Sequence, residues 1–113
     1  MSNLEAVRGD PAAAARIFAA LGDPTRLDIL KTLSDGESRS IAALSTDRRL
    51  TRQAVTKHLH VLEAAGLVAS ARVGRESRFA YRAEPLAEAR WFLEAVSARW
   101  DASLERLRAF VED

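Results

Sequence analysis

One stretch of the chain, Thr51–Gly66, carries five polar side chains of the kinds that bind nucleic acid. At about 100° per residue in a helix these side chains share one arc, and Val55, Leu59 and Leu62 lie on the opposite side. Guanidinium, ammonium, amide, hydroxyl and imidazole groups suit base edges and phosphates. We therefore predict a helix that reads the DNA major groove, the alternative being the solvated face of an ordinary surface helix. The arc consists of Arg52, Gln53, Thr56, Lys57 and His60.

Local signals mark both ends of this stretch. Thr51 is a suitable N-cap, and Gly66 can adopt the left-handed conformation that ends a helix. The recognition helix is therefore expected over residues 51–66.

Positive charge gathers in the middle of the chain, although the net charge is only +1. Between Arg39 and Arg82, nine basic residues stand against three acidic ones, so this segment is +6 and the remainder −5. A basic middle between acidic ends favours a surface that binds a polyanion.

The totals indicate one folded domain over residues 1–113, with 48% hydrophobic and 29% charged residues. Residues 1–9 carry no clear signal and are expected to be a flexible arm. The chain has neither a membrane-spanning apolar run nor a signal peptide at its start, so we expect a cytoplasmic protein without membrane contact. The absence of cysteine excludes disulfides and thiolate metal sites.

Two Asp-Pro pairs, at residues 10–11 and 23–24, are typical of helix starts. The first helix is expected to end at Gly22, and its many alanines either allow close approach of another helix or simply favour helix formation. We expect Arg26 and Lys31 of the second helix to face solvent or phosphate. The apolar residues of this second, central helix are Leu27, Ile29, Leu30 and Leu33.

A short helix is expected over residues 38–44, capped by Ser38 or Ser40, followed by a polar connector over residues 45–50. Helix, connection and helix form the helix-turn-helix arrangement. Ser40 and Thr51, at the starts of its two helices, join the predicted DNA contacts.

A β-hairpin is predicted over residues 67–82, with strands at 67–73 and 78–82 around a turn at 74–77. Arg72, Arg75 and Arg78 gather toward its tip, where they can grip phosphates or reach a minor groove. Charges that serve only solubility are the alternative.

The last helix is expected over residues 85–111, roughly 40 Å long at 1.5 Å per residue. Such a length and so regular an apolar stripe favour a partner helix over packing on the chain's own core. The stripe consists of Leu86, Ala89, Leu93, Val96, Trp100, Leu104 and Leu107.

Segments 18–30 (FAALGDPTRLDIL) and 51–68 (TRQAVTKHLHVLEAAGLV), with the Gly-Arg-Glu hairpin at 74–76, resemble the ArsR family of winged helix-turn-helix repressors over residues 12–105. The resemblance implies a mainly α fold with a β-hairpin wing, and a homodimer formed through the first and last helices. It also implies recognition helices in successive major grooves, wings on the flanking backbone, and repression of a promoter.

Matched to the family, Arg52, Gln53, Thr56 and Lys57 correspond to base and phosphate contacts. Arg75 and Arg78 correspond to the wing, and we interpret His58 as mainly structural. The residues assigned to the dimer are Ala14, Ile17, Phe18, Leu86, Leu93, Val96, Trp100, Leu104 and Leu107.

The sequence departs from the metal-sensing members of the family. It has no cysteine, and its last helix has no histidine. His58 and His60 project about 200° apart on one helix, so they cannot share an ion. We therefore expect no metal and no cofactor.

Three other functions were weighed against a dimeric repressor of a double-stranded DNA operator. A winged helix that binds protein fits the basic middle poorly. An enzyme fits poorly too, because two histidines, no cysteine and no Gly-rich phosphate loop leave little catalytic equipment. An apolar small-molecule inducer stays open, with rings that otherwise serve packing. Those rings are Trp91, Trp100, Phe92 and Tyr81.

Overall fold

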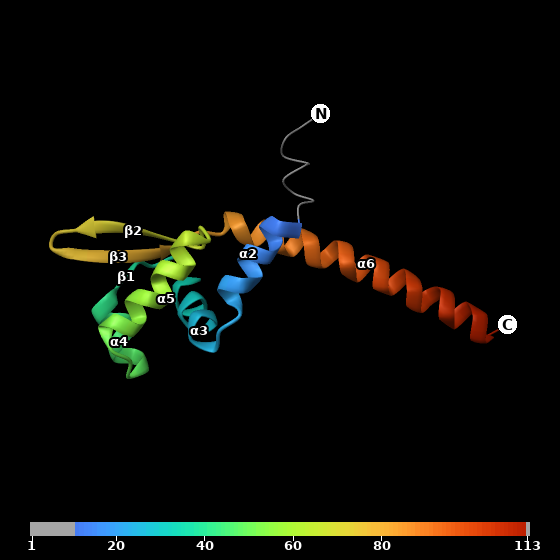
Figure 1. The fold of residues 1–113 in the computed structure, drawn as a ribbon, viewed down its shortest axis with the longest axis horizontal. Helices are drawn as coiled ribbons and strands as arrows, with labels where there is room; N and C mark the ends of the chain where they lie inside the picture. The colour runs from blue at the N-terminus through green and yellow to red at the C-terminus, as the bar shows by residue number, and fades with distance from the viewer. Residues whose placement is uncertain (1–10, 113) are drawn as a thin grey trace, which may run out of the picture.

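The computed structural model describes residues 11–112, which form five helices and a small antiparallel sheet (Figure 1). In chain order the elements are α2 (Pro11–Leu21), α3 (Pro24–Leu33), β1 (Arg39–Ser40), α4 (Ile41–Arg48), α5 (Arg52–Ala64), β2 (Val68–Val73), β3 (Glu76–Tyr81) and α6 (Glu84–Glu112). The β2–β3 hairpin extends from one end of the molecule, and α6 extends from the other (Figure 1). The expected mainly α fold with a β-hairpin wing is confirmed. The predicted arm at residues 1–9 and the Asp10 cap lie outside the described residues.

The core forms where α3, α4 and α5 meet the inner face of the hairpin. Val55, Leu59 and Leu62 of α5 are fully buried, as the helical periodicity predicted. Ile29 and Leu33 of α3 are buried beside them. Burying these side chains leaves the other side of α5 to solvent, which is the condition for a reading surface.

Leu27 is the exception among the apolar residues of α3. It was expected in the core, yet 51% of it is exposed. The buried residues of α3 are Ile29, Leu30 and Leu33. At about 100° per residue, Leu27 lies roughly 110° from the middle of that buried side, at its exposed margin.

The local helix signals act as predicted. The side chain of Asp23 accepts a hydrogen bond from the Arg26 amide at 3.0 Å, and Thr51 caps α5 through the Ala54 amide at the same distance. Gly66 follows α5 with φ of +77°. These caps define where α3 begins and where α5 begins and ends.

Replacing Gly66 with alanine is expected to destabilise the fold by about 1–2 kcal/mol. An added Cβ would adopt an unfavourable left-handed conformation and meet Cγ of Pro85 at 3.3 Å. Urea unfolding followed by circular dichroism measures the loss. Gly22→Ala is the control, because Gly22 has no positive φ and its nearest contacts are 3.4 Å or more; equal destabilisation of both variants would contradict the argument.

The sheet has the order β1-β3-β2, all antiparallel. The hairpin turn is shorter than predicted, because Glu76 and Ser77 pair with Val73 and Arg72 instead of belonging to the turn. The two-residue strand β1 was not predicted at all. It carries no local β signal and exists because Arg39 and Ser40 pair with β3.

The α4 helix also corrects the prediction. Ser40 is its cap, accepting from the Ala43 amide at 3.1 Å, and the helix continues to Arg48. The expected connector at residues 45–50 is therefore mostly helical, and the link to α5 consists of residues 49–51. Thr46 and Asp47 suggested a loop because they are polar, but they are exposed residues on the solvent side of the helix.

The α6 helix is 29 residues long, about 43 Å at 1.5 Å per residue. Only its first part packs on the body, against α2, and the remainder projects freely (Figure 1). Within residues 11–112, no helix combines the length and apolar character needed to cross a membrane.

Candidate nucleic-acid interface

The link between α4 and α5 is a tight turn fixed by its own hydrogen bonds. Arg49 takes a left-handed conformation with φ of 55° and ends α4. The Leu50 amide donates to the Ser45 carbonyl at 3.2 Å, and the Ser45 hydroxyl donates back to the Leu50 carbonyl. With Thr51 capping α5, the two helices form a helix-turn-helix of defined angle.

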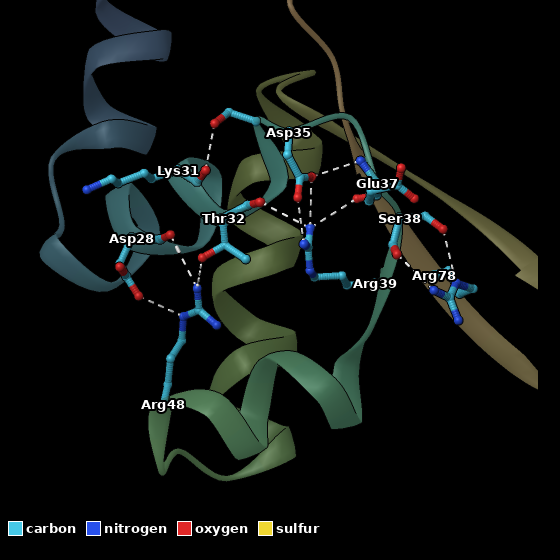
Figure 2. Close-up of polar contacts among 10 residues, drawn as sticks. Asp28, Lys31, Thr32, Asp35, Glu37, Ser38, Arg39, Arg48 and Arg78 are labelled. Atoms are coloured by element: carbon cyan, nitrogen blue, oxygen red, sulfur yellow. Dashed lines mark hydrogen bonds and ion pairs between the residues drawn. The ribbon is translucent and has the colours of Figure 1, made fainter.

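Arg48 braces this pair against α3 (Figure 2). Its guanidinium donates to the Leu44 carbonyl at 3.2 Å and to the Thr32 hydroxyl. Its Nε lies 2.9 Å from the Asp28 carboxylate but outside hydrogen-bond geometry, so this contact is an ion pair only. Arg48, expected in a polar connector, therefore holds α4 against α3. The only signal for it was that Asp28 and Thr32 are four residues apart, on one side of α3.

Two further arginines, Arg39 and Arg78, hold the hairpin and the strand before α4 in place (Figure 2). Arg39 donates to both carboxylate oxygens of Asp35, at 3.0 and 2.7 Å. Arg78 donates to the hydroxyl and carbonyl oxygens of Ser38, at 3.0 and 2.8 Å, and to Glu76 at 3.2 Å. The guanidinium of Arg78, predicted to contact DNA, is therefore engaged at the base of the wing.

Replacing Asp35 with asparagine is expected to lower stability at neutral pH and to flatten its fall in acid. The hydrogen bonds from Arg39, and then that from the Glu37 amide, lower the pKa of Asp35 from 3.8 to about 2. A lowered folded-state pKa stabilises above pH 3.8, and this stabilisation is lost as the pH falls from 3.8 toward 2. Urea unfolding at several pH values measures it. Asp101→Asn, an exposed change on α6, should keep the wild-type acid slope.

The predicted reading face of α5 is presented to solvent. Arg52, Gln53, Lys57 and His60 are exposed, and Thr56 is half-buried with its hydroxyl donating to the Arg52 carbonyl at 2.7 Å. The predicted arrangement of polar and apolar sides therefore occurs in the structure.

Five basic side chains on the reading face, on the turn before it and on the hairpin have no internal partner in the described part of the chain. Within residues 11–112, the side chains of Arg49, Arg52, Lys57, Arg72 and Arg75 form no hydrogen bond or ion pair with the protein. By contrast, Arg39, Arg48 and Arg78 of the same segment are all paired internally, as the contacts above describe. Unpaired cations leave a positive potential directed at solvent.

A cleft of about 460 Å³ brings several of the predicted residues together. It lies between the start of α4, the first turns of α5 and the hairpin. Its lining includes Ser40, Arg52, Thr56, Arg72 and Arg75. Gln53, Lys57 and His60 do not line it and lie along the outer side of α5. Ser40 itself is nearly buried and caps α4, and Thr51 likewise uses its hydroxyl as a cap.

The residues assigned to a dimer fall into two groups. Ala14 and Ile17 are buried within the chain itself, and Phe18 and Leu86 are half-buried at the junction of α2 and α6. The rest of the stripe is exposed in one chain, from 48% at Leu104 to 64% at Trp100. The exposed group is Leu93, Val96, Trp100, Leu104 and Leu107.

The four rings considered for an inducer site do not share a cavity. An apolar groove of about 670 Å³ between α2, the end of β3 and α6 is lined by Tyr81, but not by Trp91, Phe92 or Trp100. Phe92 packs edge-on against Phe18, with ring centroids 6.0 Å apart. In the part of the chain that the structure describes, no three His, Cys, Asp or Glu side chains gather at a possible metal position.

A helix-turn-helix with an exposed polar reading helix, followed by a basic hairpin, defines a winged helix-turn-helix DNA-binding protein. A family model described as a helix-turn-helix domain matches residues 21–71. The chain is 45% identical over 76 residues to YuzN, an uncharacterized HTH-type transcriptional regulator of Bacillus subtilis, covering 62% of this chain and 83% of that one. It is 42% identical over 77 residues to the HTH-type transcriptional regulator CmtR of Mycobacterium tuberculosis, covering 68% and 64%.

Comparison with solved structures leads to the same class of protein. An ArsR-like transcriptional regulator from Rhodococcus sp. RHA1 matches with a TM-score of 0.74 and 40% identity, covering 88% of this chain and 92% of that one. Reduced HlyU from Vibrio cholerae matches with a TM-score of 0.61 and 28% identity, covering 73% and 84%. The chain therefore belongs to the ArsR-like family of winged helix-turn-helix transcriptional regulators, which are not enzymes.

Proposed function

We propose that this transcriptional regulator is a homodimeric repressor that binds a palindromic operator without a metal ion. The observation that carries the proposal is the set of unpaired cations on α5 and the hairpin. Five such side chains lie on the reading helix, on the turn before it and on the wing. Each cation that replaces a condensed counterion on DNA adds affinity that depends on salt.

The arginines of this segment fall into a paired group and an unpaired group, and this difference supports the proposed DNA binding. Arg39, Arg48 and Arg78 pair with acidic side chains and donate hydrogen bonds to carbonyl oxygens, and so hold α3, α4 and the wing in place. The neighbouring Arg52, Arg72 and Arg75 line one cleft without an internal partner. A protein–protein module of the same fold would not need three unpaired arginines around one cleft.

The free part of α6 supports the homodimer. Its apolar stripe continues from the groove beside α2 toward the C-terminus, and Phe110 and Val111 at the end are 81% and 73% exposed. Burying one leucine or phenylalanine side chain contributes about 1.5–3 kcal/mol. A second copy of the chain that covers the stripe would bury these apolar side chains on both chains. Paired recognition helices would then meet half-sites about 34 Å apart.

The absence of cysteine from the sequence supports metal independence, because thiolates are the ligands that favour tight soft-metal sites. Operator affinity should be unchanged by a chelator. As a regulator that acts on DNA, the protein is expected to work in the cytoplasm.

Selection of bound sequences from a random DNA pool tests the proposal. Recovered sites should be inverted repeats with half-sites one helical turn apart, and affinity should fall steeply as salt rises. A transcription assay with polymerase on a promoter that overlaps the site should show less transcript when the protein is added. No enrichment from the pool at low salt would overturn the proposal and favour a protein-binding module.

A further inference from the structure

One side chain, Arg26 of α3, joins the end of α2 to the inner edge of α5. Its Nε donates to the Ala20 carbonyl at 2.6 Å, and its Nη2 donates to the Ala19 carbonyl at 3.3 Å. Its Nη1 lies 3.4 Å from Nδ1 of His58. Sequence analysis placed Arg26 toward solvent or phosphate, and this expectation is wrong.

The chemistry of these contacts suits an arginine and no other residue. The last carbonyls of a helix lack partners within the helix, and a cation there is also favoured by the helix dipole. A planar guanidinium directs its donors in several fixed directions, so it can serve two carbonyls and one imidazole at once. A lysine ammonium is a single point of charge on a flexible stem.

The location of His58 suits a structural role, in which it fixes the orientation of α5, and does not suit a contact with DNA. It lies in α5 between exposed Lys57 and buried Leu59, and 25% of its side chain is exposed. Its Nδ1 is 3.8 Å from the Asp23 carboxylate, and Asp23 in turn accepts from the Arg26 amide at 3.0 Å. The start of α3, the end of α2 and the reading helix therefore share one polar cluster.

The α2 helix connects this cluster to α6. Phe18 of α2 packs edge-on against Phe92 of α6, and Ile17 and Ala20 of α2 are buried in the core. A continuous set of contacts therefore runs from α6 through α2 and Arg26 to α5.

We propose that Arg26 is a positioning residue that holds α5 at a fixed angle to α2, and thereby couples the dimer helices to sequence-specific reading. This inference rests on the proposed function. Two recognition helices must enter grooves at a fixed spacing, so a small rotation of α5 on α2 misaligns both of them. Phosphate contacts tolerate such a shift better than base contacts, which need defined geometry.

The test compares affinity for the selected operator with affinity for an unrelated duplex of equal length, at several salt concentrations. For Arg26→Ala, the ratio of the two affinities should fall about tenfold, the equivalent of one base contact, with an unchanged salt slope. Arg26→Lys should recover only part of the ratio. A loss of stability alone would lower both affinities together and leave the ratio as it was.

His58 provides a second pair of variants on the partner side. His58→Asn places an oxygen near the position of Nδ1 and should keep the ratio, whereas His58→Leu removes the ring nitrogen beside Arg26 and should match Arg26→Ala. An unchanged ratio in Arg26→Ala and His58→Leu would overturn the coupling, and so would a reduced salt slope, which would make Arg26 a phosphate contact. A wild-type protein without any operator preference would instead overturn the proposed function itself, and the coupling with it.

Discussion

Replacing Arg52 and Lys57 together with alanine is expected to reduce operator affinity about a hundredfold while leaving the fold intact. Both side chains are exposed on α5, and neither has a hydrogen-bond or ion-pair partner within residues 11–112. Their removal therefore breaks no internal hydrogen bond or ion pair. Because each phosphate contact contributes about 0.9 to the salt slope, the slope should also become shallower by up to about two per protomer.

The measurement is fluorescence anisotropy with the selected operator at three or more salt concentrations. A matched control removes the same charge from elsewhere: Lys31→Ala with Arg99→Ala. These two side chains are exposed on α3 and α6 and also have no hydrogen-bond or ion-pair partner in the described part of the chain. The control should keep nearly full affinity. Equal losses in the two double variants would mean that net charge, and not this face, accounts for binding.

Replacing Trp100 and Leu104 together with glutamate is expected to convert the proposed dimer to monomers and to lower operator affinity by at least about a hundredfold. In one chain Trp100 is 64% exposed and Leu104 is 48% exposed, so charges there are tolerated by the monomer. At a buried seam, the same charges would be desolvated without partners. A monomer also loses the gain that comes from binding two half-sites at once.

Sedimentation equilibrium distinguishes the mass of one chain from that of two, and anisotropy measures the affinity. Ala98→Glu with Ala102→Glu is the control, because these exposed alanines of α6 lie about 160° from the stripe and receive the same charges. The control should remain dimeric. A wild-type chain that sediments as a monomer at micromolar concentration would rule out the dimer, whereas a monomeric control would place the interface on the other side of α6.

Together, these two sets of variants distinguish the loss of DNA contacts from the loss of dimerisation. The Arg52 and Lys57 variant should remain dimeric and lose affinity through its phosphate and base contacts. The Trp100 and Leu104 variant should lose affinity through the second half-site while each chain keeps its reading face. A shallower salt slope is expected in both, because a monomer also makes fewer phosphate contacts, so the oligomeric state is the readout that tells them apart.

The errors in the sequence analysis have physical causes. Polar Thr46 and Asp47 suggested a loop, but a helix needs only one apolar side, and α4 buries Leu44 and Ser45 on that side. The strand β1 depends on pairing with β3, which no window of local sequence contains. Leu27 was assigned to the core from its type alone, although the side of α3 that bears it is not covered within the chain.

The sequence by itself determined the features that depend on neighbours along the chain. Thr51, Gly66 and the Asp-Pro pair at residues 23–24 delimit helices through hydrogen bonds and backbone conformations only a few residues long. The periodicity of α5 separates its buried and exposed sides in the same local way. Only the tertiary structure decided what each arginine does, because a guanidinium finds its partners across elements. Arg26, Arg48 and Arg78 each donate to a residue between 6 and 40 positions away, whereas the side chains of Arg52 and Arg75 have no partner within residues 11–112 and are proposed to contact DNA.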